Sequence, residues 1–97
     1  MNAHKINAVS RSIMSTLVDK MSKKVSADEV RILYSSLEFM IENERKQEAF
    51  SLLHTIIKIS GIRLPEEYSC IVDNEKLRAD FVEEAVEDLE DILYDLE

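Results

Sequence analysis

The chain has 97 residues, a length typical of one domain, and we expect residues 1–97 to form a single helical domain. A hydrophobic fraction of 45% excludes a wholly disordered chain, and no apolar run approaches the roughly 18 residues that a membrane span needs. A formal net charge of −8, a lone cysteine and the lack of a hydrophobic signal sequence predict a cytoplasmic protein without an internal disulfide.

The scarcity of turn-forming residues predicts helices rather than sheets. One glycine and one proline in the whole chain leave few places for the tight turns of hairpins. Apolar residues instead recur three and four positions apart, as they do on one side of an α-helix. We therefore predict an all-α fold, a bundle of four main helices at about 5–24, 27–43, 46–60 and 74–96, with an irregular connection at 61–73.

The second predicted helix is apolar on two sides. Ser26 and Glu29 form a capping box at its start. Its main apolar stripe consists of Val30, Leu33, Tyr34, Leu37, Met40 and Ile41. Ile32 and Phe39, seven positions apart, point to nearly the opposite side at about 100° per residue. The helix is therefore either central in the bundle or part of an interface, and both alternatives stay open at this point.

The end of the third predicted helix and the connection after it carry local signals. Gly61 follows the last apolar residues of the third helix and suits the left-handed backbone conformation that often ends an α-helix. Pro65 can begin a single helical turn over residues 66–68. Asp73 is predicted to cap the N-terminus of the last helix.

The last predicted helix divides into an apolar half and an acidic half. The apolar half consists of Leu77, Phe81, Val82, Ala85, Val86, Leu89, Ile92, Leu93 and Leu96. The acidic half consists of Asp80, Glu83, Glu84, Glu87, Asp88, Glu90, Asp91 and Asp95. From Ala79 onward no residue is basic, so the helix lacks the counter-charges four positions away that would normally stabilise it. Tyr94 lies within the acidic half and is predicted to be an exposed aromatic side chain.

Charge is distributed unevenly along the chain. Residues 1–25 carry five basic residues and one acidic residue, whereas residues 61–97 carry three basic and thirteen acidic residues. The first and last helices are therefore expected either to be neighbours in one bundle or to meet between subunits, and a homodimer is left open. The acidic last third favours a protein partner with a basic surface, and it argues against direct contact with nucleic acid or with a membrane.

Residues suited to catalysis or metal binding are scarce. The chain has no HExxH pair, no Glu-x-x-His pair and no glycine-rich phosphate loop. His54 falls on the polar side of its helix and is predicted to be solvated, and Cys70 is expected to be a half-buried small side chain. We therefore expect no enzyme activity, no catalytic residue, no cofactor and no bound metal.

These observations favour a small non-enzymatic protein that binds another protein as a regulator, adaptor, chaperone or inhibitor. The predicted docking residues are Asp80, Glu83, Glu87, Glu90, Asp91 and Tyr94 on the last helix, with Ile32 and Phe39 on the second. The alternative is an acidic DNA mimic, whose carboxylates would occupy the basic groove of a nucleic-acid-binding protein. A third hypothesis is direct DNA binding through Lys5, Arg11, Lys20, Lys23 and Lys24, and the net negative charge weakens it.

Overall fold

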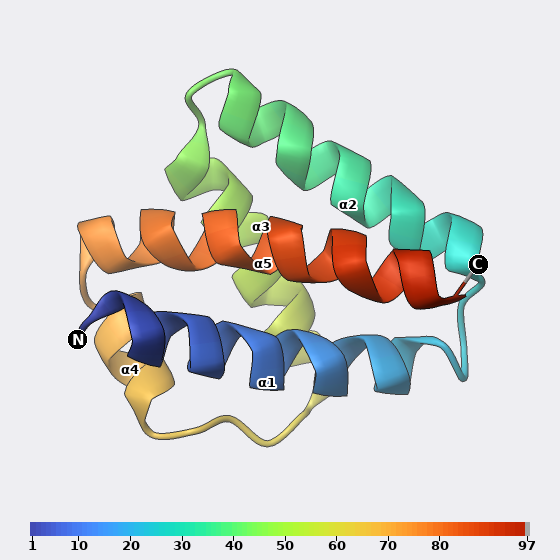
Figure 1. Cartoon of the computed structure of the whole chain (residues 1–97), viewed down its shortest axis with the longest axis horizontal. Coiled ribbons are helices and arrows are strands. Elements are labelled where there is room, and N and C mark those ends of the chain that lie inside the picture. The colour runs from blue at the N-terminus through green and yellow to red at the C-terminus, as the bar shows by residue number, and fades with distance from the viewer. Residues whose placement is uncertain (97) are drawn as a thin grey trace.

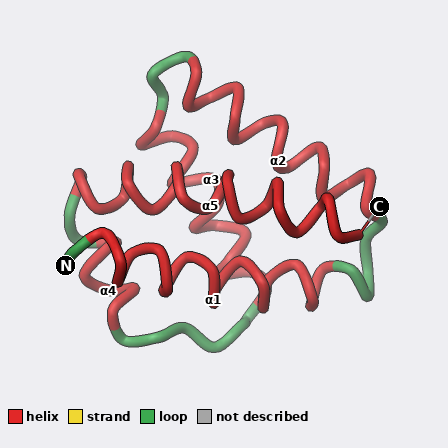
Figure 2. Tube along the Cα trace, in the orientation of Figure 1, coloured by secondary structure: helices red, strands yellow, loops and turns green. Residues whose placement is uncertain are grey.

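A computed structural model describes residues 1–96 of the chain. Over these residues the backbone forms five helices and no strand: α1 (Ala3–Met21), α2 (Ala27–Glu42), α3 (Lys46–Ser60), α4 (Glu67–Val72) and α5 (Glu75–Leu96). The predicted all-α bundle of four main helices is therefore confirmed. Figure 2 shows that helix makes up most of the trace and that the longest loop joins α3 to α4. None of the helices within residues 1–96 is long and apolar enough to cross a membrane.

Helix α5 is the central element of the bundle. It packs against α1, α2, α3 and α4, and Figure 1 shows it between α1 and α2 with α3 crossing behind. Helices α1 and α5 lie side by side and run in the same direction, whereas α2 runs back along α5 (Figure 1). The side chains of Phe81, Val82, Ala85 and Leu89 are fully buried in the middle of this arrangement. The apolar half of α5 is therefore the centre of the core, as its pattern predicts.

The helix ends follow local sequence signals in most places. The Ser26 hydroxyl accepts a hydrogen bond from the backbone N–H of Glu29 at 3.3 Å and lies 3.4 Å from the Glu29 carboxylate, which confirms the predicted cap. Gly61 adopts φ +70°, the left-handed conformation expected at the end of α3. Helix α1 ends at Met21, earlier than predicted, and residues 22–25 form a turn before α2.

The connection between α3 and α5 differs from the prediction in two respects. The turn expected over residues 66–68 continues as α4 to Val72, because Tyr68 and Ile71 are buried against the core and hold a further turn in place. The N-terminal cap of α5 is Asn74 and not Asp73, since the Asn74 side-chain oxygen accepts from the Leu77 N–H at 3.0 Å.

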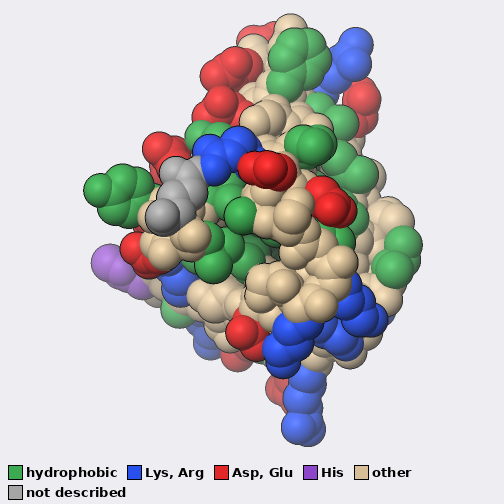
Figure 3. Space-filling model, turned by 90° about the vertical axis from the view of Figure 1, so that its right-hand side faces the viewer, with side chains coloured by type: hydrophobic (Ala, Val, Ile, Leu, Met, Phe, Trp, Pro, Cys, Tyr) green, Lys and Arg blue, Asp and Glu red, His purple; other side chains and the backbone are tan. Residues whose placement is uncertain are grey.

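Basic and acidic side chains are segregated on the surface. Figure 3 looks along the longest axis at the end of the molecule where α1 and α5 finish and α2 begins. On this face the largest group of Lys and Arg side chains lies in the lower part, over the end of α1, and most Asp and Glu side chains lie above it. The charge asymmetry of the sequence is therefore also an asymmetry of this face.

Candidate functional site

The predicted docking residues of α5 form one continuous strip along its outer side. We call Asp80, Glu83, Glu87, Glu90, Asp91 and Tyr94 the acidic strip. Successive members are one turn or less apart, so their side chains follow one another along the helix. Glu87, Glu90 and Asp91 are exposed and Asp80 and Glu83 are half-buried. The Tyr94 side chain is 81% exposed, as predicted.

Several carboxylates of the acidic strip are paired with residues from other helices. Lys46 of α3 forms an ion pair with Glu83, and the hydrogen bond raises the pKa of Lys46. Arg11 of α1 donates to Asp91 at 2.9 Å. The absence of basic residues from Ala79 onward in α5 is therefore compensated across the bundle, and the expectation that α1 and α5 are neighbours is confirmed within one chain.

Tyr34 of α2 lies close to the strip as well. Its hydroxyl donates to Glu38 at 2.7 Å and is 3.3 Å from Glu90. The acceptor carboxylate of Glu38 raises the pKa of Tyr34 above its ordinary value, with burial as the second cause. Glu90 is thus held between two helices, which limits its freedom to meet a partner.

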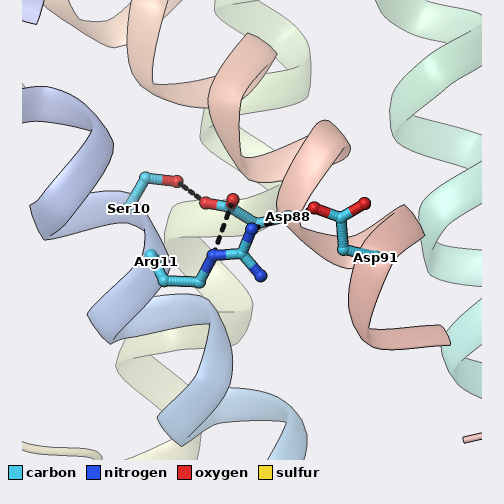
Figure 4. Close-up of polar contacts among 4 residues, drawn as sticks. All are labelled: Ser10, Arg11, Asp88 and Asp91. Carbon is cyan, nitrogen blue, oxygen red and sulfur yellow. Dashed lines mark hydrogen bonds and ion pairs between the residues drawn. The ribbon is translucent and has the colours of Figure 1, made fainter. Parts of the chain in front are cut away.

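Asp88 is the clearest departure from the predicted acidic half of α5. It is only 5% exposed and faces α1, where Ser10 donates to it at 2.7 Å and the Arg11 guanidinium lies 3.1 Å away. Figure 4 shows Ser10 and Arg11 of α1 converging on this carboxylate. The helical wheel places Asp88 at the border of the two halves, and the position of α1 buries that border. The expectation that Asp88 is solvated is therefore wrong, and its role is structural.

The exposed centre of the acidic strip is consequently smaller than the sequence suggests. Within residues 1–96, Glu87 and Tyr94 form no hydrogen bond or ion pair, and neither does Asp95 beside them. Glu84, on the edge of the strip, has a raised pKa because it is partly buried and because the charge of Glu87 is close. Glu87 and Tyr94 are thus the members of the strip most available to a partner.

The second predicted surface lies on α2. Ile32 and Phe39 are 65% and 62% exposed, and they flank a shallow hollow with Arg31, Ser35, Ser36 and Met40. Figure 1 places α2 at the periphery of the bundle, so the alternative in which this helix is central does not hold. Ile32 and Phe39 are surface residues, as an interface requires.

A groove beside His54 is a feature that the sequence did not reveal. The His54 Nδ1 atom is 2.7 Å from the Tyr68 hydroxyl, and its ring stacks on Phe50 with the centroids 5.6 Å apart. Burial lowers the pKa of His54, and the positive charge of Lys58 lowers it further. The predicted solvated His54 is therefore a half-buried, hydrogen-bonded residue, because Tyr68 of α4 packs against its ring.

Other residues that line this groove include Lys58, Leu64, Pro65, Glu66, Ser69, Val72 and Asp73. These residues include positively and negatively charged side chains, and their arrangement does not favour one class of ligand. The neighbouring Cys70 is exposed, so the prediction that it is half-buried is wrong. It lies on the outer side of α4, away from the buried Tyr68 and Ile71.

Metal-binding clusters are lacking in the part of the chain that the structure describes, where no three His, Cys, Asp or Glu side chains converge. Comparison with family models, with curated proteins and with solved structures found no match to this chain. The candidate site is therefore defined by the geometry of the chain's own surfaces.

Proposed function

We propose that the protein is a non-enzymatic protein-binding module that docks a partner with a basic surface through the acidic strip of α5. The observation that carries this proposal is the 81% exposure of Tyr94 beside unpaired carboxylates on the most firmly held helix. A large amphipathic ring is a frequent anchor at protein interfaces, and it loses few rotatable bonds when it is immobilised. Glu87, about two turns earlier on the same side of α5, supplies negative charge.

The position of α5 in the fold supports this proposal. A helix packed on four neighbours presents its outer side chains on a rigid backbone, so little conformational entropy is lost when a partner binds. Ion pairs with Arg11 and Lys46 hold two carboxylates of the strip in place. The strip is therefore preorganised, with Glu87 accessible between its fixed members and Tyr94 accessible at its C-terminal end.

Electrostatics indicates the class of partner. Like charges gathered on one side of a rigid helix attract a basic surface and accelerate encounter, and salt screens this attraction. The DNA-mimic alternative is a narrower version in which the partner's basic surface is also its DNA-binding groove. Arg11 and Lys46 weaken this alternative, because they place positive charge within the strip that a mimic of the phosphate backbone lacks.

A double variant tests the proposal at two positions that form no hydrogen bond or ion pair within residues 1–96. Tyr94→Ala combined with Glu87→Lys should leave folding intact, and the protein should lose a partner that wild type retains in an affinity pull-down from host lysate. The matched control is Glu42→Lys, which makes the same charge change at an exposed position of α2. Circular dichroism and thermal unfolding verify that all variants are folded.

The outcome of the pull-down is decisive for the strip. If the double variant retains the same proteins as wild type at every salt concentration, the acidic strip is not the docking site. When a partner is lost, competition with duplex DNA then decides between the two versions. A partner that binds DNA equally well when saturated with this protein excludes the DNA mimic.

A further inference from the structure

An apolar patch with a basic rim lies between the ends of α1 and α3. Its lining residues are Lys20, Met21, Lys24, Val25, Ile56, Ile59 and Ser60. Ile59 is 80% exposed, and Lys20 and Lys24 are exposed on the rim. None of the lining residues is acidic, and two of them are lysines. We call this surface the basic patch.

The chemistry of the basic patch selects an acidic occupant with an apolar or aromatic anchor. A protruding isoleucine among half-buried apolar side chains is typical of a contact surface, because such a side chain loses unfavourable hydration when it is covered. Two lysines on the rim attract carboxylates to the edge of the same contact. The patch therefore fits a surface that carries an apolar or aromatic side chain next to carboxylates.

The complementary surface is present on the same chain and at the same end of the molecule. Tyr94 and Asp95 are exposed in the last turns of α5, and Asp28 is exposed in the first turn of α2. Figure 3 shows this end with the main basic group low on the face and most of the acids above it. A two-fold axis that lies in the plane of this face turns a second copy onto the first. The acidic half of each copy then contacts the basic half of the other, so the contact occurs twice.

We propose that two copies of this chain associate through this end, with Tyr94 of each copy docked on the basic patch of the other. Asp28 and Asp95 then approach Lys20 and Lys24 of the partner copy. Each contact occurs twice and the assembly closes as a dimer, so no filament forms. The inference rests on the proposed function in one respect, since both use Tyr94 as the docking anchor.

The size of the face is compatible with a reversible dimer. The molecule measures 30 × 23 Å in the two directions across this end, and a rectangle of these sides covers roughly 700 Å², the same order as the ~800 Å² that a standard interface buries on each partner. Much of the contact is charged and lies at the rim, where it is exposed to salt. The dimer should therefore weaken as the ionic strength rises.

Sedimentation equilibrium over a range of protein concentrations tests the proposal, with two variants of opposite design. Lys20→Glu with Lys24→Glu replaces the lysines of the basic patch by acids, and Asp28→Lys with Asp95→Lys replaces the acids that approach them by lysines. We expect each variant alone to dimerise about tenfold more weakly than wild type or to be monomeric. An equimolar mixture should form a heterodimer, because both contacts between the two variants are then attractive. Glu42→Lys controls for the change in net charge.

Three results would overturn the dimer. These are a wild-type protein that stays monomeric at every concentration, variants that dimerise as well as wild type, and a mixture that fails to associate. Vesicles of phosphatidylcholine with phosphatidylserine provide the remaining arm. If wild type stays monomeric but binds them, and Lys20→Glu with Lys24→Glu abolishes this binding, the basic patch meets an anionic lipid surface and the dimer proposal is wrong.

The same variants separate this inference from the proposed function. Glu87 lies in the middle of α5, away from the end face, so Glu87→Lys should lose the lysate partner and keep the dimer. Lys20→Glu with Lys24→Glu should lose the dimer and keep the partner. A monomeric wild type that still captures its partner through Glu87 contradicts only the dimer. A dimer with no partner dependent on Glu87 contradicts only the proposed function.

Discussion

Ser10 of α1 and Asp88 of α5 form a buried hydrogen bond of 2.7 Å across 78 positions of the chain. The Asp88 carboxylate also forms an ion pair with the Arg11 guanidinium. A carboxylate that the helical pattern places on the acidic half of α5 therefore links the two parallel helices. Within residues 1–96 no buried side-chain nitrogen or oxygen lacks a hydrogen-bond partner. The α1–α5 contact is therefore specified by a polar cluster as well as by apolar packing.

Removal of the Asp88 carboxylate should destabilise the fold. Asp88→Ala leaves the buried Ser10 hydroxyl without its acceptor and creates a small cavity, and we expect a loss of about 2 kcal/mol in the free energy of unfolding. Urea denaturation followed by circular dichroism measures it. Asp95→Ala, at an exposed position in the last turn of the same helix, should change stability by no more than about 0.5 kcal/mol. Equal effects of the two substitutions would contradict a structural role for Asp88.

Stability should depend on pH through His54. Its pKa is lowered in the folded state by burial and by Lys58, so the unfolded chain binds the proton more readily. The stability that depends on neutral His54 is fully present above the ordinary pKa of about 6.5. It is lost as the pH falls toward the lower pKa of the folded state. Wild type should therefore lose more stability than His54→Gln between about pH 7 and pH 5.

The Lys58 charge offers a direct check on the cause of that shift. Lys58→Met removes the positive charge near His54 but leaves the ring as buried as before. The pKa of His54 should therefore rise but stay below about 6.5. A titration of the His54 ring followed by NMR reports this value. A His54 pKa that does not respond to the loss of Lys58 would leave burial as the whole cause.

The two apolar sides of α2 should respond differently to substitution. Ile32→Ser and Phe39→Ser remove exposed side chains, and each should change the free energy of unfolding by no more than about 0.5 kcal/mol. Leu37→Ala removes a fully buried side chain of the same helix and should cost about 2–5 kcal/mol. Chemical denaturation at low protein concentration, where self-association is negligible, provides the comparison. A large loss at Phe39 would show that it packs within its own chain.

Gly61 should be sensitive to substitution for conformational reasons alone. At φ +70° an L-residue is strained, while the nearest atom to an added Cβ is the flexible Lys20 Nζ at 3.8 Å. Gly61→Ala should therefore destabilise the protein by about 1 kcal/mol without any clash. Gly61→Asn should cost less, since asparagine tolerates the left-handed region better. Thermal unfolding of the two variants ranks them, and equal costs would point to a different cause.

Local sequence patterns were sufficient to place the four main helices and most of their ends. Apolar spacing depends on neighbours three and four positions away, and caps such as Ser26 and Gly61 act within a few residues, so local pattern is enough to place them. It also determined that Tyr94 and Glu87 are exposed, because both lie well inside the acidic half of α5. The exposure of Ile32 and Phe39 was one of two alternatives that the pattern allowed.

Whether a side chain at the edge of a helix is buried or exposed depends on the tertiary packing. A helical wheel gives the direction of a side chain but does not say which element lies there. Asp88 is buried because α1 covers its side of α5, and His54 is half-buried because Tyr68 of α4 stacks on its ring. The counter-charges of the acidic strip likewise come from Arg11 and Lys46, which are far away in sequence. Long-range packing sets these contacts, and no local periodicity encodes it.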